Sequence, residues 1–277
     1  MPGKLYIVGT PIGNLGDMTY RAVETLKSVN FIAAEDTRVT QKLLSYFDIK
    51  KPLVSYHEHN RKAAGDEISE RLEAGETCAV VTDAGMPCIS DPGEDLVRLC
   101  AERGIPMEVV PGPSAVISAL AVSGLDTSKF AFEGFLSTAP NSRKETLTRV
   151  TQETRTLIFY EAPHKLEATL NDLYKFLGDR KVSICRELTK LHEEVIRTTL
   201  SGAKELYSGV KPRGEFVLVI EGLKQEPISE LTLEDALAQV RSLIEKGARQ
   251  TYACREIAKI TGFTKSELYS ALLAEKG

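Results

Sequence analysis

The feature that most constrains the fold of this chain is a regular alternation of short apolar runs with segments of helical periodicity over residues 4–124. Runs typical of buried strands occur at residues 4–9, 31–36, 53–57, 77–83 and 107–112. Segments with helical spacing follow them at residues 19–29, 38–47, 61–75, 94–104 and 113–124. Strands that alternate with helices are joined by right-handed crossovers and form a largely parallel sheet, covered on both faces. The sequence therefore predicts an α/β fold for this stretch.

The pattern continues beyond residue 125 with less regularity. Strand-like runs occur at residues 130–135, 154–162, 182–188, 193–202 and 214–223. A helix is predicted over residues 162–178, with Pro163 in its first turn and Gly178 at its end. The run 193–202 is rich in β-branched residues and is followed by only a short helical segment, which favours a mixed sheet. We expect a second α/β lobe of this kind.

A polar, proline-bearing stretch at residues 224–231 predicts a linker. Three short helices are predicted beyond it, with Ala258, Gly262 and Leu268 at the spacing of a helix-turn-helix. Residues 225–277 carry seven bases against eight acids, and this balance does not favour reading of duplex DNA. We expect an N-terminal lobe at 1–118, a C-terminal lobe at 119–223 and a helix-turn-helix-like domain at 230–277.

The composition is that of an ordinary soluble protein, with 277 residues, 42% of them hydrophobic and 27% charged. No apolar run approaches the roughly 20 residues that span a bilayer. The N-terminus lacks the apolar core of a signal peptide, so we expect a cytoplasmic protein. Five cysteines without a CxxC pair or a Cys/His cluster argue against a disulfide framework and a zinc site. No metal is expected.

Charge is segregated along the chain although its net value is only −4. Residues 38–62 carry six bases against two acids, and residues 180–213 carry eight bases against four acids. Such segments are consistent with a polyanion held on one face, and equally with ordinary solvated surface charge.

Three loops rich in glycine and proline each follow a predicted strand, at residues 8–14, 82–95 and 109–120. Open α/β sheets bind their ligands at the carboxyl ends of strands. In the second loop, Asp91, Pro92 and Glu94 match a helix-capping pattern. That pattern leaves the small residues before it unexplained, and they suggest close approach of the backbone to a ligand.

The first loop superficially matches a dinucleotide-binding fingerprint, which would make the chain a nicotinamide-dependent oxidoreductase. The spacing is wrong, because Gly9 and Gly13 are four residues apart. Pro11 stands where backbone would approach a pyrophosphate, and proline has no N–H to offer a phosphate. The loops therefore indicate a ligand site that is not of the dinucleotide type.

The three loops contain the sequences GTPIGN, DAGMPCISDPG and PGPSA. In this order they resemble the motifs of the tetrapyrrole-methylase-like class of S-adenosylmethionine-dependent methyltransferases. Further segments resemble its bacterial ribosomal RNA small-subunit 2′-O-methyltransferase branch: TYRAVETL, AAEDTR, SYHEHN, FEGFL, FYEAPHK and CRELTKLHEE. The resemblance covers residues 4–223, and the appended helices also fit. It implies two α/β lobes with S-adenosylmethionine in the cleft between them, a homodimer, and methylation of a cytidine ribose in the decoding region of the small ribosomal subunit.

The resemblance also implies roles for individual residues. Those expected to contact S-adenosylmethionine are Pro11, Ile12, Met86, Ile89, Ser114, Ala115, Glu161, Leu188 and Glu215, or Gly214 in place of Glu215. Tetrapyrrole-specific members carry GDP where this chain has Gly85-Met86-Pro87. That departure favours the RNA branch, with a porphyrinoid methyltransferase as the nearest alternative.

A ribose hydroxyl is a poor nucleophile at neutral pH, so a base or an orienting hydrogen bond is expected. Glu35, Asp36 and Asp83 are the principal candidates, with His57 and Glu58 as further ones; surface ion pairs or helix caps are the competing interpretation for each acid.

Candidates for RNA contact are Arg21, Arg38, His57, His59, Asn60, Arg61 and Arg186. Tyr56 is expected to add a stacking face beside this run. An alternative interpretation, that the protein is a DNA-binding regulator, would depend on the C-terminal helices alone.

Overall fold

The computed structural model describes residues 3–224 and 232–274, and the chain separates into a first unit ending at Leu223 and a second beginning at Lys224. Each unit has hydrophobic clusters of its own. Apart from Lys224, the linker predicted at 224–231 lies outside the described residues, as do the ends of the chain.

The first unit begins with a five-stranded, entirely parallel sheet in the order β3-β2-β4-β1-β5. Its strands are β1 (Leu5–Val8), β2 (Phe31–Ala34), β3 (Leu53–Ser55), β4 (Cys78–Val81) and β5 (Met107–Val110). All residues of β2 and β4 are buried, as strands covered on both faces require. The parallel sheet predicted from the alternating pattern is confirmed.

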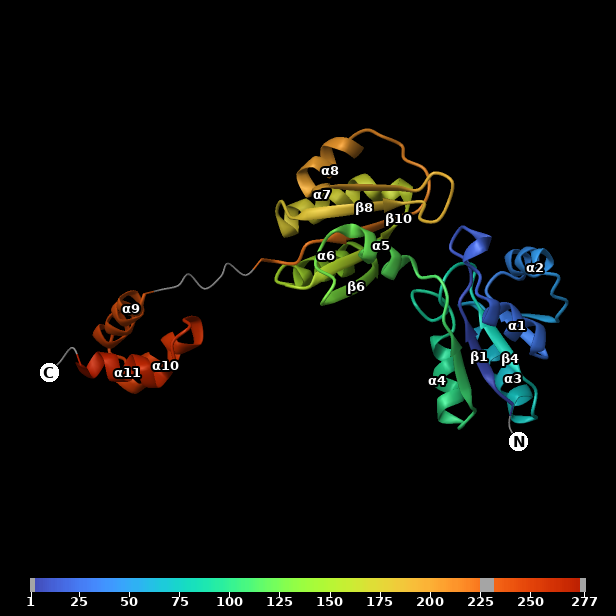
Figure 1. Cartoon of the computed structure of the whole chain (residues 1–277), viewed down its shortest axis with the longest axis horizontal. Helices are drawn as coiled ribbons and strands as arrows, with labels where there is room; N and C mark the ends of the chain where they lie inside the picture. Colours follow the sequence, from blue (N-terminus) through green and yellow to red (C-terminus); the bar gives the residue numbers. More distant parts are fainter. Residues whose placement is uncertain (1–2, 225–231, 275–277) are drawn as a thin grey trace. The chain divides into compact units, whose positions relative to one another are not determined.

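Helices cover both faces of this sheet (Figure 1). One face packs against α1 (Tyr20–Ser28) and α2 (Thr37–Tyr46), and the other against α3 (Arg61–Glu73) and α4 (Glu94–Glu102). The side chain of Thr19 accepts the N–H of Ala22 and so begins α1. Leu26 of α1 and Leu96 of α4 are fully buried on opposite faces of the sheet.

The second lobe contains a mixed sheet in the order β6-β7-β10-β8-β9, which confirms the expectation drawn from the β-branched run. The strands are β6 (Phe130–Phe135), β7 (Thr156–Glu161), β8 (Lys181–Arg186), β9 (Glu194–Thr199) and β10 (Phe216–Ile220). Helix α5 (Ala115–Ser123) packs on one face. Helices α6 (Pro140–Val150), α7 (Leu166–Leu177) and α8 (Leu200–Tyr207) pack on the other.

Two features of this lobe differ from the sequence-based expectation. Helix α6 was not predicted, since it is polar and places only Leu147 and Val150 in the core. The helix predicted from residue 162 begins as a 3-10 turn at Pro163–Lys165, and the α-helical part starts at Leu166. Short 3-10 turns are common where an α-helix begins.

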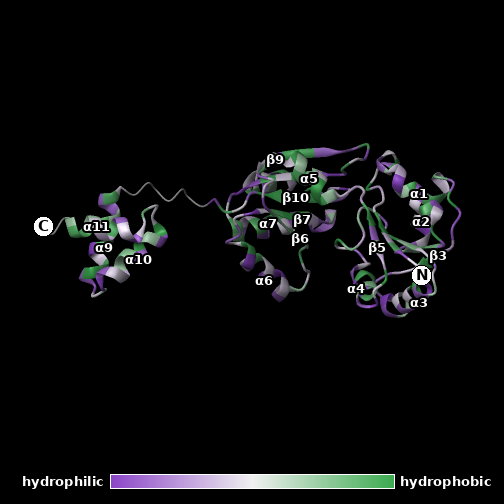
Figure 2. Ribbon diagram, turned by 60° about the horizontal axis from the view of Figure 1, so that its bottom comes forward, coloured by the Kyte–Doolittle hydropathy of each residue, from purple (hydrophilic) through white to green (hydrophobic). Residues whose placement is uncertain are grey.

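The second unit consists of α9 (Leu233–Glu245), α10 (Gln250–Ile260) and α11 (Lys265–Ala274) around a small core of its own. The Thr232 side chain and Asp235 form a reciprocal capping box at the start of α9. Gly262 lies in the turn between α10 and α11, and Leu268 is buried. Figure 2 shows apolar residues alternating with polar ones along these helices. Among the described residues, no helix has the length and apolar character needed to cross a membrane.

Candidate functional site

Three loops meet at the carboxyl edge of the first sheet because they follow the adjacent strands β4, β1 and β5. The N–H of Thr10 donates to the Gly85 carbonyl at 2.9 Å, and the N–H of Gly85 donates to the Thr10 carbonyl at 3.1 Å. The N–H of Gly9 donates to the Val110 carbonyl at 3.1 Å. Backbone hydrogen bonds therefore join all three loops into one frame.

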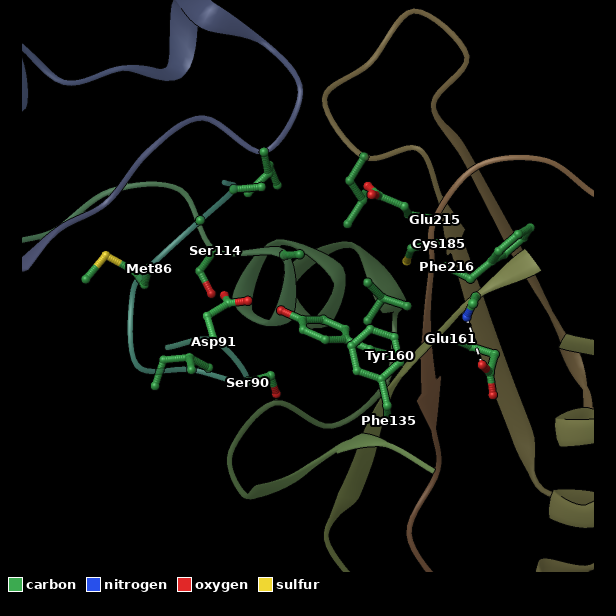
Figure 3. Close-up of a pocket in the computed structure, with 18 of the residues that line it drawn as sticks. Met86, Ser90, Asp91, Ser114, Phe135, Tyr160, Glu161, Cys185, Glu215 and Phe216 are labelled. Atoms are coloured by element: carbon green, nitrogen blue, oxygen red, sulfur yellow. Dashed lines mark hydrogen bonds between the residues drawn. The ribbon is translucent and has the colours of Figure 1, made fainter. Parts of the chain in front are cut away.

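The second loop has an unusual backbone. Cys88 and Ser90 adopt left-handed conformations, with φ of 71° and 64°, and each costs roughly 1–2 kcal/mol for a residue with a side chain. Helix α4 begins at Glu94 with Gly93 as its N-cap, and no side chain caps it. The predicted cap by Asp91 is therefore wrong. Its carboxylate turns instead into the space between the two lobes (Figure 3).

An apolar cavity of about 350 Å³ opens at this edge. The first lobe lines it with residues of the three loops, and the second lobe with residues at and beyond the carboxyl ends of β6, β7 and β8 and at the start of β10. Its charged lining residues are three acids, Asp91, Glu161 and Glu215. Within the described residues, no lysine, arginine or histidine belongs to this lining. Its electrostatic character therefore favours a cationic ligand over an anionic one.

Eight of the nine residues expected to contact the cofactor line this single cavity: Ile12, Met86, Ile89, Ser114, Ala115, Glu161, Leu188 and Glu215. They come from six separate stretches of the chain and are brought together only by the fold. Pro11 is buried beside them and is not part of the lining, and neither is Gly214.

Glu161 ends β7 and is 3% exposed. Its carboxylate accepts the N–H of Ala162 at 2.8 Å and the hydroxyl of Thr169. Arg143 in turn donates to the Thr169 hydroxyl at 2.9 Å and to Asp172 at 2.7 Å. Hydrogen bonds to both carboxylate oxygens hold Glu161 in place at the wall of the cavity.

Glu215 precedes β10, the strand that pairs with β7 at Glu161, and belongs to an ion-pair cluster. The Lys190 ammonium lies 2.9 Å from Glu215 and 2.8 Å from Glu187. A Cβ added at Gly13 would lie 2.4 Å from Cγ of Lys190. The absence of a side chain at Gly13 therefore lets the Lys190 loop of the second lobe pack directly on the first loop of the first lobe.

Sequence reasoning did not identify Phe135, Tyr160 or Asp91 as site residues, yet all three line the cavity. The aromatic pair has ring centroids 5.4 Å apart. Both aromatic residues lie in strands, where such side chains are typical of core packing, and no local signal separates the two uses. For Asp91, the sequence offered only a helix-capping pattern, and the structure shows that Asp91 does not cap α4.

A second, polar cavity of about 560 Å³ adjoins the first. It lies beyond the ends of β2 and β3 and beside the start of α4, with Glu35, His57, His59, Arg61 and Glu94 among its lining residues. Ser90 and Asp91 line both cavities. The two spaces therefore meet at this pair of residues.

Three acids near this junction have raised pKa values. Burial and repulsion by Glu35 and Asp83 raise the pKa of Asp91 to about 6. Burial and the charge of Asp83 likewise raise the pKa of Glu35, and burial is the main cause of the raised pKa of Asp83. Burial and the charge of Asp91 raise the pKa of Tyr160 to about 12. Acids with raised pKa values cluster at functional sites.

Asp36 differs from its neighbours. Its carboxylate accepts the Arg38 N–H at 2.8 Å and pairs with the Arg38 guanidinium at 2.6 Å. These contacts from Arg38 hold the pKa of Asp36 well below its usual range. The Asp36 N–H donates to the Asp83 carboxylate at 3.2 Å. The Asp36 carboxylate therefore caps α2 and is already bound by Arg38.

The residues predicted to contact RNA fall into two groups. His57, His59 and Arg61 line the polar cavity, and Arg38, 86% exposed, follows β2 at the same edge of the sheet. Arg21 lies on α1, and Arg186 ends β8 in the second lobe, where it pairs with Glu194 at 3.1 Å. The fold thus collects some of these residues at one edge and leaves others apart.

Asn60 and Tyr56 have structural contacts of their own. The Asn60 side chain accepts the N–H of His57 at 2.8 Å and donates to the Ser55 carbonyl at 2.9 Å, so it shapes the turn before α3. Tyr56 is 1% exposed and packs in the core. The stacking face expected from Tyr56 is therefore wrong, because its ring is buried under α3 and α4.

The sequence profile of the tetrapyrrole (corrin/porphyrin) methylases matches residues 4–204. Relatives named ribosomal RNA small subunit methyltransferase I match nearly the whole chain. The protein from Synechocystis is 49% identical over 98% of this chain and 98% of its own length. That from Bacillus subtilis is 44% identical over 97% of this chain and 94% of its own length.

The relative of that name from Thermotoga maritima is 50% identical over 220 residues, which are 79% of this chain and 99% of the relative. Its length is therefore close to that of the first unit alone.

Solved structures with the same fold include a uroporphyrin-III-C-methyltransferase from Thermus thermophilus, with a TM-score of 0.56 and 20% identity over 78% of this chain and 94% of that one. A diphthine synthase has a TM-score of 0.58 and 14% identity over 79% of this chain and 89% of that one. At these identities the likeness shows the fold alone. Taken with the profile and the relatives, the chain belongs to the tetrapyrrole methylase family and, within it, to the group that includes the relatives named above.

Proposed function

We propose that the protein transfers a methyl group from S-adenosylmethionine to the 2′-hydroxyl of a cytidine ribose in the decoding region of small-subunit ribosomal RNA. The observation that carries the proposal is the near-complete match, at 44–49% identity, to proteins named ribosomal RNA small subunit methyltransferase I. The structure adds a cavity of suitable character at the carboxyl edge of the sheet.

The residues of the apolar cavity fit S-adenosylmethionine. A volume of about 350 Å³ lies within the usual range for small-ligand sites. The cavity lining is acidic, and the methyl donor carries a sulfonium and an ammonium group. Ile12 and Leu188 offer apolar contact to an adenosine, while Ser114 and Glu215 offer polar contact. When bound there, the donor supplies an activated methyl group.

The same acidic lining argues against the nicotinamide-dependent oxidoreductase. A pyrophosphate in the apolar cavity would face the carboxylates of Asp91 and Glu161 without a cation among the described lining residues, and Glu215 is already paired with Lys190. Desolvating like charges beside one another is costly. Together with Pro11 in the first loop, the cavity supports the methyl donor over a dinucleotide.

The chain's own residues position the acceptor and exclude water. Methyl transfer is an in-line displacement, and holding the two reactants in attack geometry supplies much of the rate enhancement. Arg38, His59 and Arg61 are suited to hold the RNA backbone near the polar cavity. The base candidates Glu35, Asp36 and Asp83 stay predictions, and the engagement of Asp36 with Arg38 favours the other two.

We also propose a homodimer and a cytoplasmic location. Large apolar side chains are exposed in the second lobe, among them Ile117 of α5 at 53% and Leu191 of the loop after β8 at 94%, and side chains of this kind are candidates for an interface when they form a patch. Sedimentation of the purified protein tests the dimer. Fractionation of cells tests the location.

The decisive experiment compares small-subunit ribosomal RNA from cells with and without the gene. Mass spectrometry of nuclease fragments is expected to show one fragment lighter by one methyl group, and hydrolysis to nucleosides places that group on a cytidine ribose. Purified protein and S-adenosylmethionine should restore the mass on subunits from the deletion strain. Identical fragments from both strains would refute the proposal, and methylation of a free porphyrinoid alone would support the tetrapyrrole alternative.

A further inference from the structure

The two cavities at the carboxyl edge of the first sheet share two residues, Ser90 and Asp91. A reaction between a ligand in the apolar cavity and one in the polar cavity therefore takes place beside this pair. Of the two side chains, only Asp91 is a base at neutral pH.

The Asp91 carboxylate is free for such a role. Among the contacts of the described residues, no hydrogen bond or ion pair engages it, and it does not cap α4. This distinguishes it from Asp36, which is bound by Arg38, and from Asp83, which accepts the N–H of Asp36. Glu35 lines only the polar cavity.

The backbone around Asp91 is built to direct it inward. Cys88 and Ser90 are both in the left-handed region on its N-terminal side. On the other side, Gly93 has φ of 131°, and a Cβ there would lie 2.8 Å from the Sγ of Cys88. Figure 3 shows the Asp91 carboxylate facing the Tyr160 hydroxyl across the cavity. Non-glycine residues held in such conformations are typical of functional sites.

We propose that the polar cavity receives the acceptor nucleoside and that Asp91, at its junction with the donor cavity, accepts the proton of the hydroxyl being methylated. This inference rests on the proposed function, in particular on the two reactants. The hydroxyl oxygen forms a bond to the methyl carbon as the carbon–sulfur bond breaks, with its electron pair left on sulfur. The hydroxyl proton moves to a carboxylate oxygen of Asp91 and is later lost to water.

The surroundings of Asp91 suit a base that works near neutral pH. The titratable groups that interact electrostatically with Asp91 are Glu35 after β2, Asp83 after β4, Tyr160 of β7 and Cys88 of its own loop. Other charged or titratable residues line the same polar cavity, among them Glu94, His57, His59 and Arg61. Repulsion by Glu35 and Asp83 makes the carboxylate a stronger base than an exposed aspartate. A base of this strength is still mostly deprotonated at pH 7.

The test is a single-turnover assay with enzyme in excess over small ribosomal subunits from a deletion strain, at pH 5 to 9. In the wild type the rate should rise with pH and level off above the titration of Asp91. Asp91→Asn should slow the reaction about 10²- to 10⁴-fold. The rate of this variant should also no longer show the rise with pH, the rising limb of the wild-type profile. Its affinity for S-adenosylmethionine, measured by calorimetry without RNA, should stay within about threefold, because the role is in proton transfer rather than donor binding.

Two further variants keep the test decisive if the asparagine variant folds poorly. Asp91→Glu should retain the rising limb at a reduced rate. Glu35→Gln should move the limb to lower pH, because one repulsive charge next to Asp91 is gone. Glu102→Gln, an exposed acid at the end of α4, serves as the matched control and should behave as the wild type.

A readout independent of activity is the carboxyl carbon resonance of Asp91, assigned by its absence in Asp91→Asn. It should titrate well above the range of an ordinary aspartate. The inference is overturned if Asp91→Asn keeps the wild-type rate and pH profile, or if it loses only donor affinity. If the wild type itself leaves the subunits unmethylated, the proposed function has failed instead.

Discussion

Gly9 and Gly112 lie in direct backbone contact, and this contact joins the first and third loops of the donor cavity. A Cβ added at Gly9 would lie 2.8 Å from the Cα of Gly112, and one added at Gly112 would lie 3.0 Å from the Cα of Gly9. Neither position has room for a side chain, because a Cβ on either glycine would meet the backbone of the other, and one on Gly9 would also lie 2.7 Å from the Sδ of Met86. The two glycines thus allow the β1 and β5 loops to close on each other.

Gly9→Ala is therefore expected to spread the loops. Overpacking of this kind costs roughly 1–3 kcal/mol, and the displaced loop should weaken binding of S-adenosylmethionine by at least about tenfold. Calorimetry and thermal unfolding measure the two effects. Gly65→Ala is the matched control, since a Cβ there meets its neighbours at an ordinary 3.7 Å. Unchanged donor affinity in Gly9→Ala would contradict the structural role of the contact.

Arg38→Ala should weaken binding to small ribosomal subunits, because one phosphate contact is lost. In a plot of the logarithm of the affinity against the logarithm of the salt concentration, the slope should be shallower than that of the wild type by about one. Arg155→Ala provides a close control. Both guanidinium groups pair at 2.6 Å with an acid two residues earlier, Asp36 or Glu153. Arg155 precedes β7, roughly 20 Å along the strand from the cavity at Glu161. Equal salt slopes for the two variants would remove Arg38 from the RNA surface.

Asp91→Asn should stabilise the protein at neutral and alkaline pH. The folded-state pKa of Asp91, about 6, lies above the ordinary value of 3.8, so the ionised carboxylate destabilises the folded state once the pH rises above that ordinary value. The effect grows up to about pH 6 and is then constant.

For a carboxyl that is only half-buried we expect roughly 1–2 kcal/mol at pH 8, less than the full shift implies. Unfolding in urea at pH 4 and pH 8 measures the difference. Below pH 4 the variant and the wild type should have equal stability. A variant less stable than the wild type at pH 8 would show that the carboxylate has a stabilising partner.

A chain ending at residue 224 should fold and bind S-adenosylmethionine with an affinity within about threefold of the full chain. The reason is that the described residues of the second unit form a hydrophobic core of their own, and every lining residue of the apolar cavity precedes Leu223. Calorimetry with both proteins is the measurement. A shortened chain that is folded by circular dichroism but has lost donor binding would mean that residues beyond 224 contribute to the site.

Much of this architecture follows from local pattern. Apolar runs of strand length separated by helical periodicity predicted the parallel sheet, and the β-branched run at β9 predicted the mixed one. Glycine and proline at strand ends located the loops of the site, since only certain backbone conformations suit these residues. The polar helix α6 was not predicted, because only Leu147 and Val150 face its core and so small an apolar face gives little periodic signal.

The strand order could not be obtained from local pattern. By inserting β4 between β2 and β1, the fold brings the second loop beside the first and sets Asp83 next to Asp36. It also decided that Tyr56 is buried and that Asp91 faces a cavity instead of capping a helix. The sequence by itself determined the elements and the loops between them, because propensity and periodicity act over neighbouring residues. Only the tertiary structure determined which loops meet and which carboxylates repel one another, because those contacts join residues far apart in the chain.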